Sequence, residues 1–123
     1  MKTFRTIVPD QEAPFCIAHT DRTLLIGSCF TEHIGERLAA GKFPVLPNPN
    51  GIVYNPVSIA RCLHTLQQPD FDPGKALFEH LGLWHSWEHH GRFSHPDRHT
   101  AAEKIRAAHR QADKAIHRRT RGI

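Results

Sequence analysis

The apolar residues of this chain follow first the pattern of a buried strand and then the pattern of a helix. Residues 23–26 form a short, mostly apolar run that Gly27 ends, as expected for a buried strand. From Phe30 to Leu38, apolar residues recur at the i, i+4, i+8 spacing of one helix face, and Gly41 is placed to end that helix. The pattern therefore predicts a strand, a tight turn at Gly27 and a helix directly after it.

The same order of strand and helix recurs in the next part of the chain. Residues 43–46 predict a second strand, which Pro44 restricts to a sheet edge or to a strand start. A loop rich in proline and asparagine follows over residues 47–51. Asn55 has the side chain of a helix N-cap, with proline directly after it, and Pro69 is placed to end that second helix.

The remaining segments complete the predicted order. Residues 3–8 predict a short edge strand, and residues 69–99 predict a long irregular stretch rich in glycine, proline and histidine. A last helix is expected from Thr100, with Glu103 three residues later as in a capping box, to residue 116. The alternation of strands and helices predicts an α/β fold with parallel strands.

This order holds too few strands for a complete α/β sheet, which usually has about five strands or more. We therefore expect residues 1–116 to form the N-terminal portion of a larger domain, or a unit that needs a partner such as a second copy of the chain. Residues 117–123 are expected to form a disordered basic tail.

The net charge of +4 changes this picture little. The excess of Lys and Arg lies after residue 100, where it suits either an anionic partner or the solvated face of a helix. No aromatic residue is interleaved with these charges for base stacking, so we expect no nucleic-acid partner.

No apolar run has the length of a membrane span or of a signal peptide, so we expect a cytoplasmic protein without a membrane partner. The three cysteines have irregular spacing and do not predict disulfides.

The turn between the first predicted strand and helix carries two candidate nucleophiles, Ser28 and Cys29. A turn of this kind exposes a side chain, a helix N-terminus favours a thiolate, and backbone N–H groups there can stabilise an oxyanion. The alternative is that Ser28 only caps the helix and that Cys29 is a small buried apolar side chain. Spacing alone does not decide between these interpretations.

A family resemblance begins at this turn, with the motif Gly27-Ser28-Cys29-Phe30 followed by Thr31-Glu32. The motif resembles the one that gives the GSCFA family its name. The resemblance continues through further blocks in the same order, at residues 43, 48–52, 54–56, 58–59, 78–80, 82–87, 89–91 and 93–94. Because these ordered blocks are spread over nearly the whole chain, they are far more specific than one short motif.

The GSCFA family is similar to the SGNH, or GDSL-type, hydrolases, and this resemblance implies a flavodoxin-like, three-layer α/β/α fold. It also implies an esterase or acyl-transfer site that acts on an ester-like small molecule without a cofactor. Laid on the Gly-Asp-Ser block of those enzymes, Cys29 falls at the position of the nucleophilic serine and Ser28 at that of the aspartate. Oxyanion or substrate-binding roles are implied for glycines and asparagines of the turn and the following loop: Gly27, Asn48, Asn50 and Gly51.

Two further blocks of the GDSL enzymes have no match in this sequence. Their third oxyanion donor comes from a mid-domain block, and their general base comes from a C-terminal Asp-x-x-His. We therefore expect a truncated domain that is inactive on its own, whose site is complete only in intact homologues.

The histidine-rich segment 80–99 allows three interpretations. His85 and His89 are spaced to share one helix face and could bind a metal, but no further metal-binding motif accompanies them, so we expect no metal. Because they lie in or beside blocks of the family pattern, the same two residues are candidates for the active-site wall. The third interpretation is a surface loop anchored by Trp84 and Trp87. The alternative function is a non-catalytic binding module that uses this loop and the basic C-terminal helix.

Overall fold

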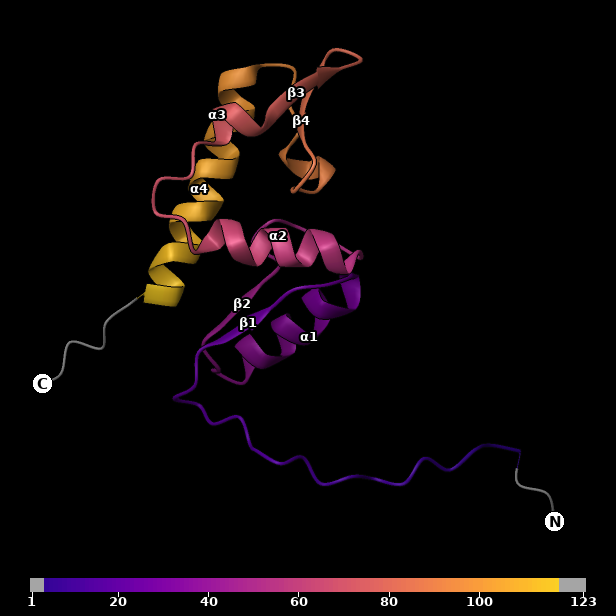
Figure 1. Ribbon diagram of the computed structural model, residues 1–123. Helices are drawn as coiled ribbons and strands as arrows, with labels where there is room; N and C mark the ends of the chain where they lie inside the picture. Colours follow the sequence, from indigo (N-terminus) through magenta and orange to yellow (C-terminus); the bar gives the residue numbers. More distant parts are fainter. Residues whose placement is uncertain (1–3, 118–123) are drawn as a thin grey trace, which may run out of the picture.

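The computed structural model describes residues 4–117, and Figure 1 shows the arrangement of their helices and strands. In chain order the elements are β1 (Thr23–Leu25), α1 (Cys29–Ala40), β2 (Val45–Pro47), α2 (Pro56–Leu66), α3 (Pro73–Ala76), β3 (Leu77–His80), β4 (Leu83–Ser86), the 3₁₀ turn η1 (Gly91–Phe93) and α4 (Arg98–His117). This mixture of helices and short strands confirms the α/β class. Residues 118–123 of the predicted basic tail lie outside the described part of the chain.

β1 and β2 form a parallel pair joined by α1, as the strand–helix–strand pattern predicts. Thr23 pairs with Val45, and Leu25 pairs with Pro47. One face of the pair lies against α1 at Gly35, where an added Cβ would lie 2.8 Å from the Cβ of Pro47. The missing side chain of Gly35 therefore allows the helix to approach the strands closely.

The opposite face of this pair is covered by α2 and α4. Apolar residues at the strands pack there against a cluster of buried helix side chains, namely Cys62, Leu66 and Ala112. The residues on the strand side are Leu24, Ile26 and Leu46. Successive side chains of a strand point to opposite faces, which is why Leu24 and Leu25 meet different helices. The parallel pair is thus a small three-layer unit with helices on both faces.

α4 is the long helix that connects the two halves of the structure (Figure 1). Near its start it contacts α3, β4 and η1, where Ala101 and Ile105 are 0% and 1% exposed. Near its end it packs against α2 through Ala112. No helix within residues 4–117 is long and apolar enough to cross a membrane.

The prediction of an irregular stretch over residues 69–99 is wrong. The segment contains α3, η1 and an antiparallel hairpin of β3 and β4, with His80 opposite Leu83. The two-residue turn, Leu81-Gly82, has positive φ at both positions, 50° and 77°, as a type I′ hairpin turn requires. The turn has Leu-Gly where the pattern that predicts a hairpin has Asn-Gly, and leucine rarely adopts positive φ. The hairpin could therefore not be predicted from the turn residues. The hairpin also shows that only β1 and β2 of the described strands are parallel.

The last helix starts earlier than predicted. α4 begins at Arg98, because the Asp97 carboxylate accepts hydrogen bonds from the N–H and from the hydroxyl of Thr100, both at 2.7 Å. These hydrogen bonds lower the pKa of Asp97. Glu103 pairs with Arg106, so the predicted capping box is not present.

The edge strand predicted for residues 3–8 is also wrong, at least over residues 4–8, since residue 3 lies outside the described part of the chain. Residues 4–22 contain no strand, and Figure 1 shows this segment leading away from the rest of the fold. Phe4 and Val8 are exposed. A strand needs a neighbour for its hydrogen bonds, and in the described structure β1 and β2 pair only with each other.

Candidate active site

The Gly27–Cys29 turn joins the carboxyl end of β1 to the start of α1. Ser28 is the N-cap of α1, and its hydroxyl oxygen accepts a hydrogen bond from the N–H of Phe30 at 3.2 Å. Cys29 is the first residue of the helix, and its thiol is free and exposed. The structure therefore uses Ser28 to cap the helix and leaves the Cys29 thiol accessible.

Asn48 holds this turn in place. Its Oδ1 accepts a hydrogen bond from the N–H of Gly27 at 2.8 Å, and its Nδ2 donates one to the carbonyl oxygen of Ser28 at 3.4 Å. Its backbone N–H donates to the carbonyl oxygen of Leu25 at 2.7 Å. Asn48 is only 2% exposed and has a φ of 42°, a conformation that asparagine tolerates better than most residues. Asn48 therefore ties the end of β2 to the turn after β1 and is a positioning residue.

The backbone N–H groups around the turn are mostly engaged. The Gly27 N–H is bound by the Asn48 side chain, and the Gly51 N–H donates to the carbonyl oxygen of Asn48 at 2.8 Å. Within residues 4–117 the N–H of Cys29 has no hydrogen-bond partner. At the turn and the start of α1, the amide groups of Ser28 and Cys29 are therefore the ones without a partner among the described residues, whereas those of Gly27, Phe30 and Thr31 are engaged.

Asn50 connects this region to the segment that follows β4. It is 4% exposed, and its Nδ2 donates a hydrogen bond to the carbonyl oxygen of Glu88 at 3.1 Å. Its own carbonyl oxygen accepts one from the N–H of His90 at 2.9 Å. Residues 86–93, which we call the 86–93 loop, therefore lie against the 48–51 turn. The Asn50 side-chain amide and backbone carbonyl oxygen both serve this contact.

The 86–93 loop brings His90 and Arg92 to this region, two residues that the sequence did not single out. The Arg92 guanidinium donates to the Glu32 carboxylate at 3.1 Å and to the carbonyl oxygen of Asn48 at 3.3 Å. The only sequence signal for His90 is its place in a family block. Arg92 has no local signal, because Glu32 is 60 residues away in sequence.

His85 and His89 make contacts within the hairpin and the loop, and no hydrogen bond joins either of them to the Gly27–Cys29 turn. In His85, Nδ1 lies 2.7 Å from the Ser94 hydroxyl. In His89, Nδ1 lies 2.8 Å from the Ser86 hydroxyl, and the ring packs against aromatic side chains. Burial lowers the pKa of His89 to about 4, with a further contribution from His109. His89 is therefore neutral near pH 7. Within residues 4–117 no group of three or more His, Cys, Asp or Glu side chains is arranged to hold a metal.

Cys62, unlike Cys29, is buried. It is 0% exposed and lies in the cluster under the parallel pair. Burial raises the pKa of the Cys62 thiol to about 11, and the nearby charge of Glu88 adds to that effect. Cys62 is therefore an unreactive core residue.

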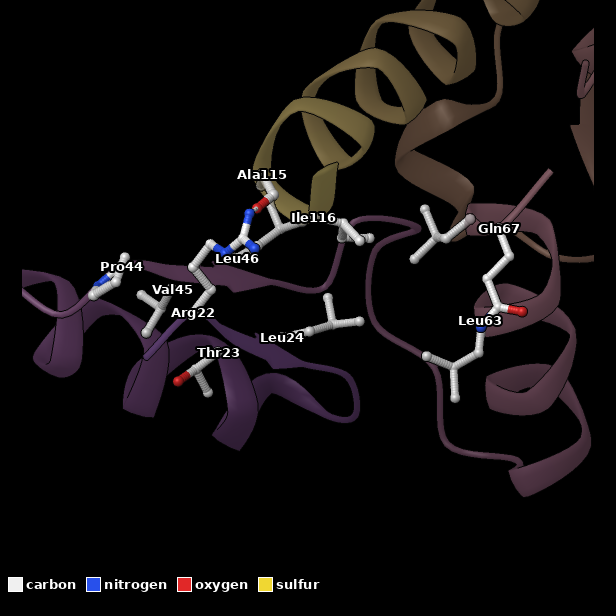
Figure 2. Close-up of a pocket in the computed structure, with 11 residues that line it drawn as sticks. Arg22, Thr23, Leu24, Pro44, Val45, Leu46, Leu63, Gln67, Ala115 and Ile116 are labelled. Carbon is white, nitrogen blue, oxygen red and sulfur yellow. Dashed lines mark hydrogen bonds between the residues drawn. The ribbon is translucent and has the colours of Figure 1, made fainter. Parts of the chain in front are cut away.

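A groove at the other end of the parallel pair lies away from Cys29. Figure 2 shows this groove of about 500 Å³, which β1, β2, α2 and the end of α4 enclose. Its strand residues include Thr23 and Val45, which are the first residues of β1 and β2. The Gly27–Cys29 turn follows the opposite end of β1, the carboxyl end, where ligands of parallel α/β sheets usually bind. The groove is therefore not part of the candidate site.

Comparison with known proteins supports the resemblance seen in the sequence. The model of the GSCFA family matches residues 22–122. No curated protein and no solved structure gives a match. The family match covers most of the chain and includes the turn, the 48–51 loop and the hairpin. The chain therefore belongs to the GSCFA family.

Proposed function

We propose that this chain carries the nucleophile of an SGNH-like hydrolase, and that the nucleophile is Cys29. The observation that carries the proposal is the exposed Cys29 thiol at the first position of α1, which a short turn joins to the parallel strand β1. The substrate class is a small ester-like molecule. The family resemblance and the position of Cys29 at the carboxyl end of β1 support this assignment.

The chemistry requires a thiolate, a carbonyl group and an oxyanion donor. The Cys29 thiol gives its proton to water, its Sγ attacks the carbonyl carbon of the ester, and the π electron pair of the C=O bond moves to the oxygen. The Cys29 N–H, which has no partner within residues 4–117, donates to that oxyanion. When the C=O bond re-forms, the C–O bond to the leaving group breaks. The alcohol leaves with a proton from water, and an acyl-Cys29 thioester is formed.

Ser28 is the weaker candidate for the nucleophile. Its hydroxyl oxygen already accepts the Phe30 N–H as the cap of α1, and its carbonyl oxygen is bound by Asn48. A Ser28 attack would require the loss of the cap, which typically contributes about 1 kcal/mol to helix stability. Ser28 therefore acts in our proposal as a positioning residue for Cys29.

Turnover needs a base that activates water against the thioester. Within residues 4–117 no histidine forms a hydrogen bond with the Cys29 thiol. We therefore propose that the 123-residue chain forms the acyl-Cys29 thioester but hydrolyses it slowly.

The test is acylation by p-nitrophenyl acetate, followed by mass spectrometry of the digested protein. We expect about one acetyl group per chain, on the peptide that holds Cys29, with little nitrophenol released after this first equivalent. The variant Cys29→Ala should abolish the burst. The matched control is Cys16→Ala, since Cys16 is the other exposed thiol. Equal acetylation of Cys16 and Cys29 contradicts the proposed nucleophile, and sustained turnover contradicts the slow hydrolysis.

A further inference from the structure

His90 lies beside the 48–51 turn that holds the nucleophile in place. Its N–H donates to the carbonyl oxygen of Asn50 at 2.9 Å. Its Cβ is so close to Gly51 that a Cβ added to Gly51 would lie 2.4 Å away. The absence of a side chain at Gly51, which also has a φ of 81°, is therefore what allows His90 to occupy this position.

Arg92 fixes the other end of the same segment to the helix that begins with Cys29. Its guanidinium contacts Glu32 on α1 and the carbonyl oxygen of Asn48. Glu32 follows Cys29 by three residues, and side chains three residues apart on a helix are neighbours on its surface. The segment from His90 to Arg92 therefore lies at the end of α1 that presents the Cys29 thiol.

The hydrogen bonds of His90 determine which ring nitrogen carries the proton. The backbone N–H of Arg92 donates to Nδ1 of His90 at 3.1 Å, so Nδ1 is an acceptor. A neutral histidine whose Nδ1 accepts carries its proton on Nε2. Within residues 4–117 this Nε2 has no partner, and the side chain is exposed. His90 is therefore a hydrogen-bond donor at its free nitrogen, and it cannot accept a proton there while neutral.

We propose that His90 is a catalytic residue that donates its Nε2–H to the oxyanion formed when Cys29 attacks an ester. This inference rests on the proposed function and extends it, because it assigns a second donor beside the Cys29 N–H. It also excludes His90 as the general base in this conformation. No proton is transferred by His90: the hydrogen bond forms as negative charge moves to the carbonyl oxygen and weakens when the leaving group departs.

The test compares two reactions of the same thiol. Acylation by p-nitrophenyl acetate passes through an oxyanion, whereas alkylation by iodoacetamide displaces iodide without forming one. Two variants separate the two nitrogens of the ring. His90→Asn keeps an acceptor near the position of Nδ1 and lacks the Nε2 donor. His90→Gln places an amide N–H near the position of Nε2.

We expect His90→Asn to slow acylation of Cys29 about 100-fold, the typical effect of one lost oxyanion donor, while alkylation keeps its wild-type rate. His90→Gln should recover much of the acylation rate. Acylation of His90→Asn at the wild-type rate would overturn the inference and leave the proposed nucleophile intact. An equal slowing of both reactions would also overturn it, because His90 would then act on the thiol itself. If wild-type Cys29 is acylated no faster than Cys16, the proposed function and this inference both fail.

Discussion

The turn at Cys29 and the 86–93 loop beside it are held by different kinds of interaction. The turn is fixed by hydrogen bonds between backbone groups and the buried Asn48 amide, none of which titrates between acid and neutral pH. The loop is also joined to Asn50 by hydrogen bonds, but it depends in addition on a half-buried neutral His89 and on an ion pair between Arg92 and Glu32. The nucleophile is therefore positioned by a rigid, pH-independent element, whereas its proposed partner His90 depends on a loop that responds to acid and salt.

Gly51 is the point where the two regions meet, and Gly51→Ala should have the largest effect. The new Cβ would lie 2.4 Å from the Cβ of His90, and alanine would have to adopt a φ of 81°. We expect a loss of about 3 kcal/mol in the free energy of unfolding, measured with urea, because strain and overpacking add. The matched control is Gly82→Ala, which has a φ of 77° and no atom within 4 Å of the added Cβ.

Gly82→Ala should lower the free energy of unfolding by only about 1 kcal/mol, which is the cost of holding alanine at positive φ. If the two alanine variants are equally stable, the close contact between Gly51 and His90 does not exist in solution.

Acid should loosen the loop and leave the turn intact. The pKa of His89 is about 4 in the folded protein, compared with 6.5 for a free histidine, so unfolding takes up a proton between these values. Stability is therefore full above pH 6.5 and is lost as the pH falls toward about 4. The expected loss is on the order of 3 kcal/mol.

The groups that face His89 are His109 of α4, which opposes its protonation, and the Ser86 hydroxyl. The measurement is urea unfolding at a series of pH values. The variant His89→Gln should remove most of the pH dependence, whereas His33→Gln, on the exposed face of α1, should retain it. A wild-type stability that stays constant through this range would contradict the burial of a neutral His89.

The sequence predicted the turn region well because its signals are local. The apolar run of β1, the helical spacing after Phe30 and the N-cap of Asn55 each depend on residues less than about ten positions apart. Each of these elements is present in the structure. The position of Cys29 at the strand-to-helix junction followed from the same local pattern.

The loop region was not predicted, because its contacts join distant parts of the chain. Arg92 reaches Glu32 across 60 residues, and Asn50 reaches Glu88 across 38. The hairpin turn at Leu81 adopts positive φ without a residue that favours it. The active-site candidacy of His85 and His89 came from their place in or beside the family blocks, and that place does not show that His89 packs against Phe71 and Phe93.

Asn48→Ala should disturb the turn more than the loop. The variant leaves the half-buried Gly27 N–H without its acceptor, whereas the Ser28 carbonyl oxygen keeps the hydrogen bond from the N–H of Thr31. We expect a loss of about 2 kcal/mol in the free energy of unfolding, because a partly buried donor loses its only acceptor. Acylation of Cys29 by p-nitrophenyl acetate should also slow. The control is Asn55→Ala, which removes a cap from α2 and should lose about 1 kcal/mol without changing Cys29 reactivity.

The ion pair between Arg92 and Glu32 should have the smallest effect on stability and the clearest dependence on salt. Its side chains are 48% and 30% exposed, and pairs of this kind contribute about 0.5 kcal/mol. Glu32→Gln should therefore change the urea midpoint little. It should instead free the Arg92 end of the loop and slow Cys29 acylation in low salt, with a smaller difference in about 1 M salt, where the wild-type pair is itself screened.

The matched control is Glu36→Gln, one turn further along α1, whose carboxylate pairs only with the exposed His33 among the described residues. A Glu32→Gln protein that acylates like the wild type at every salt concentration would show that the ion pair is not needed to hold the loop near the nucleophile.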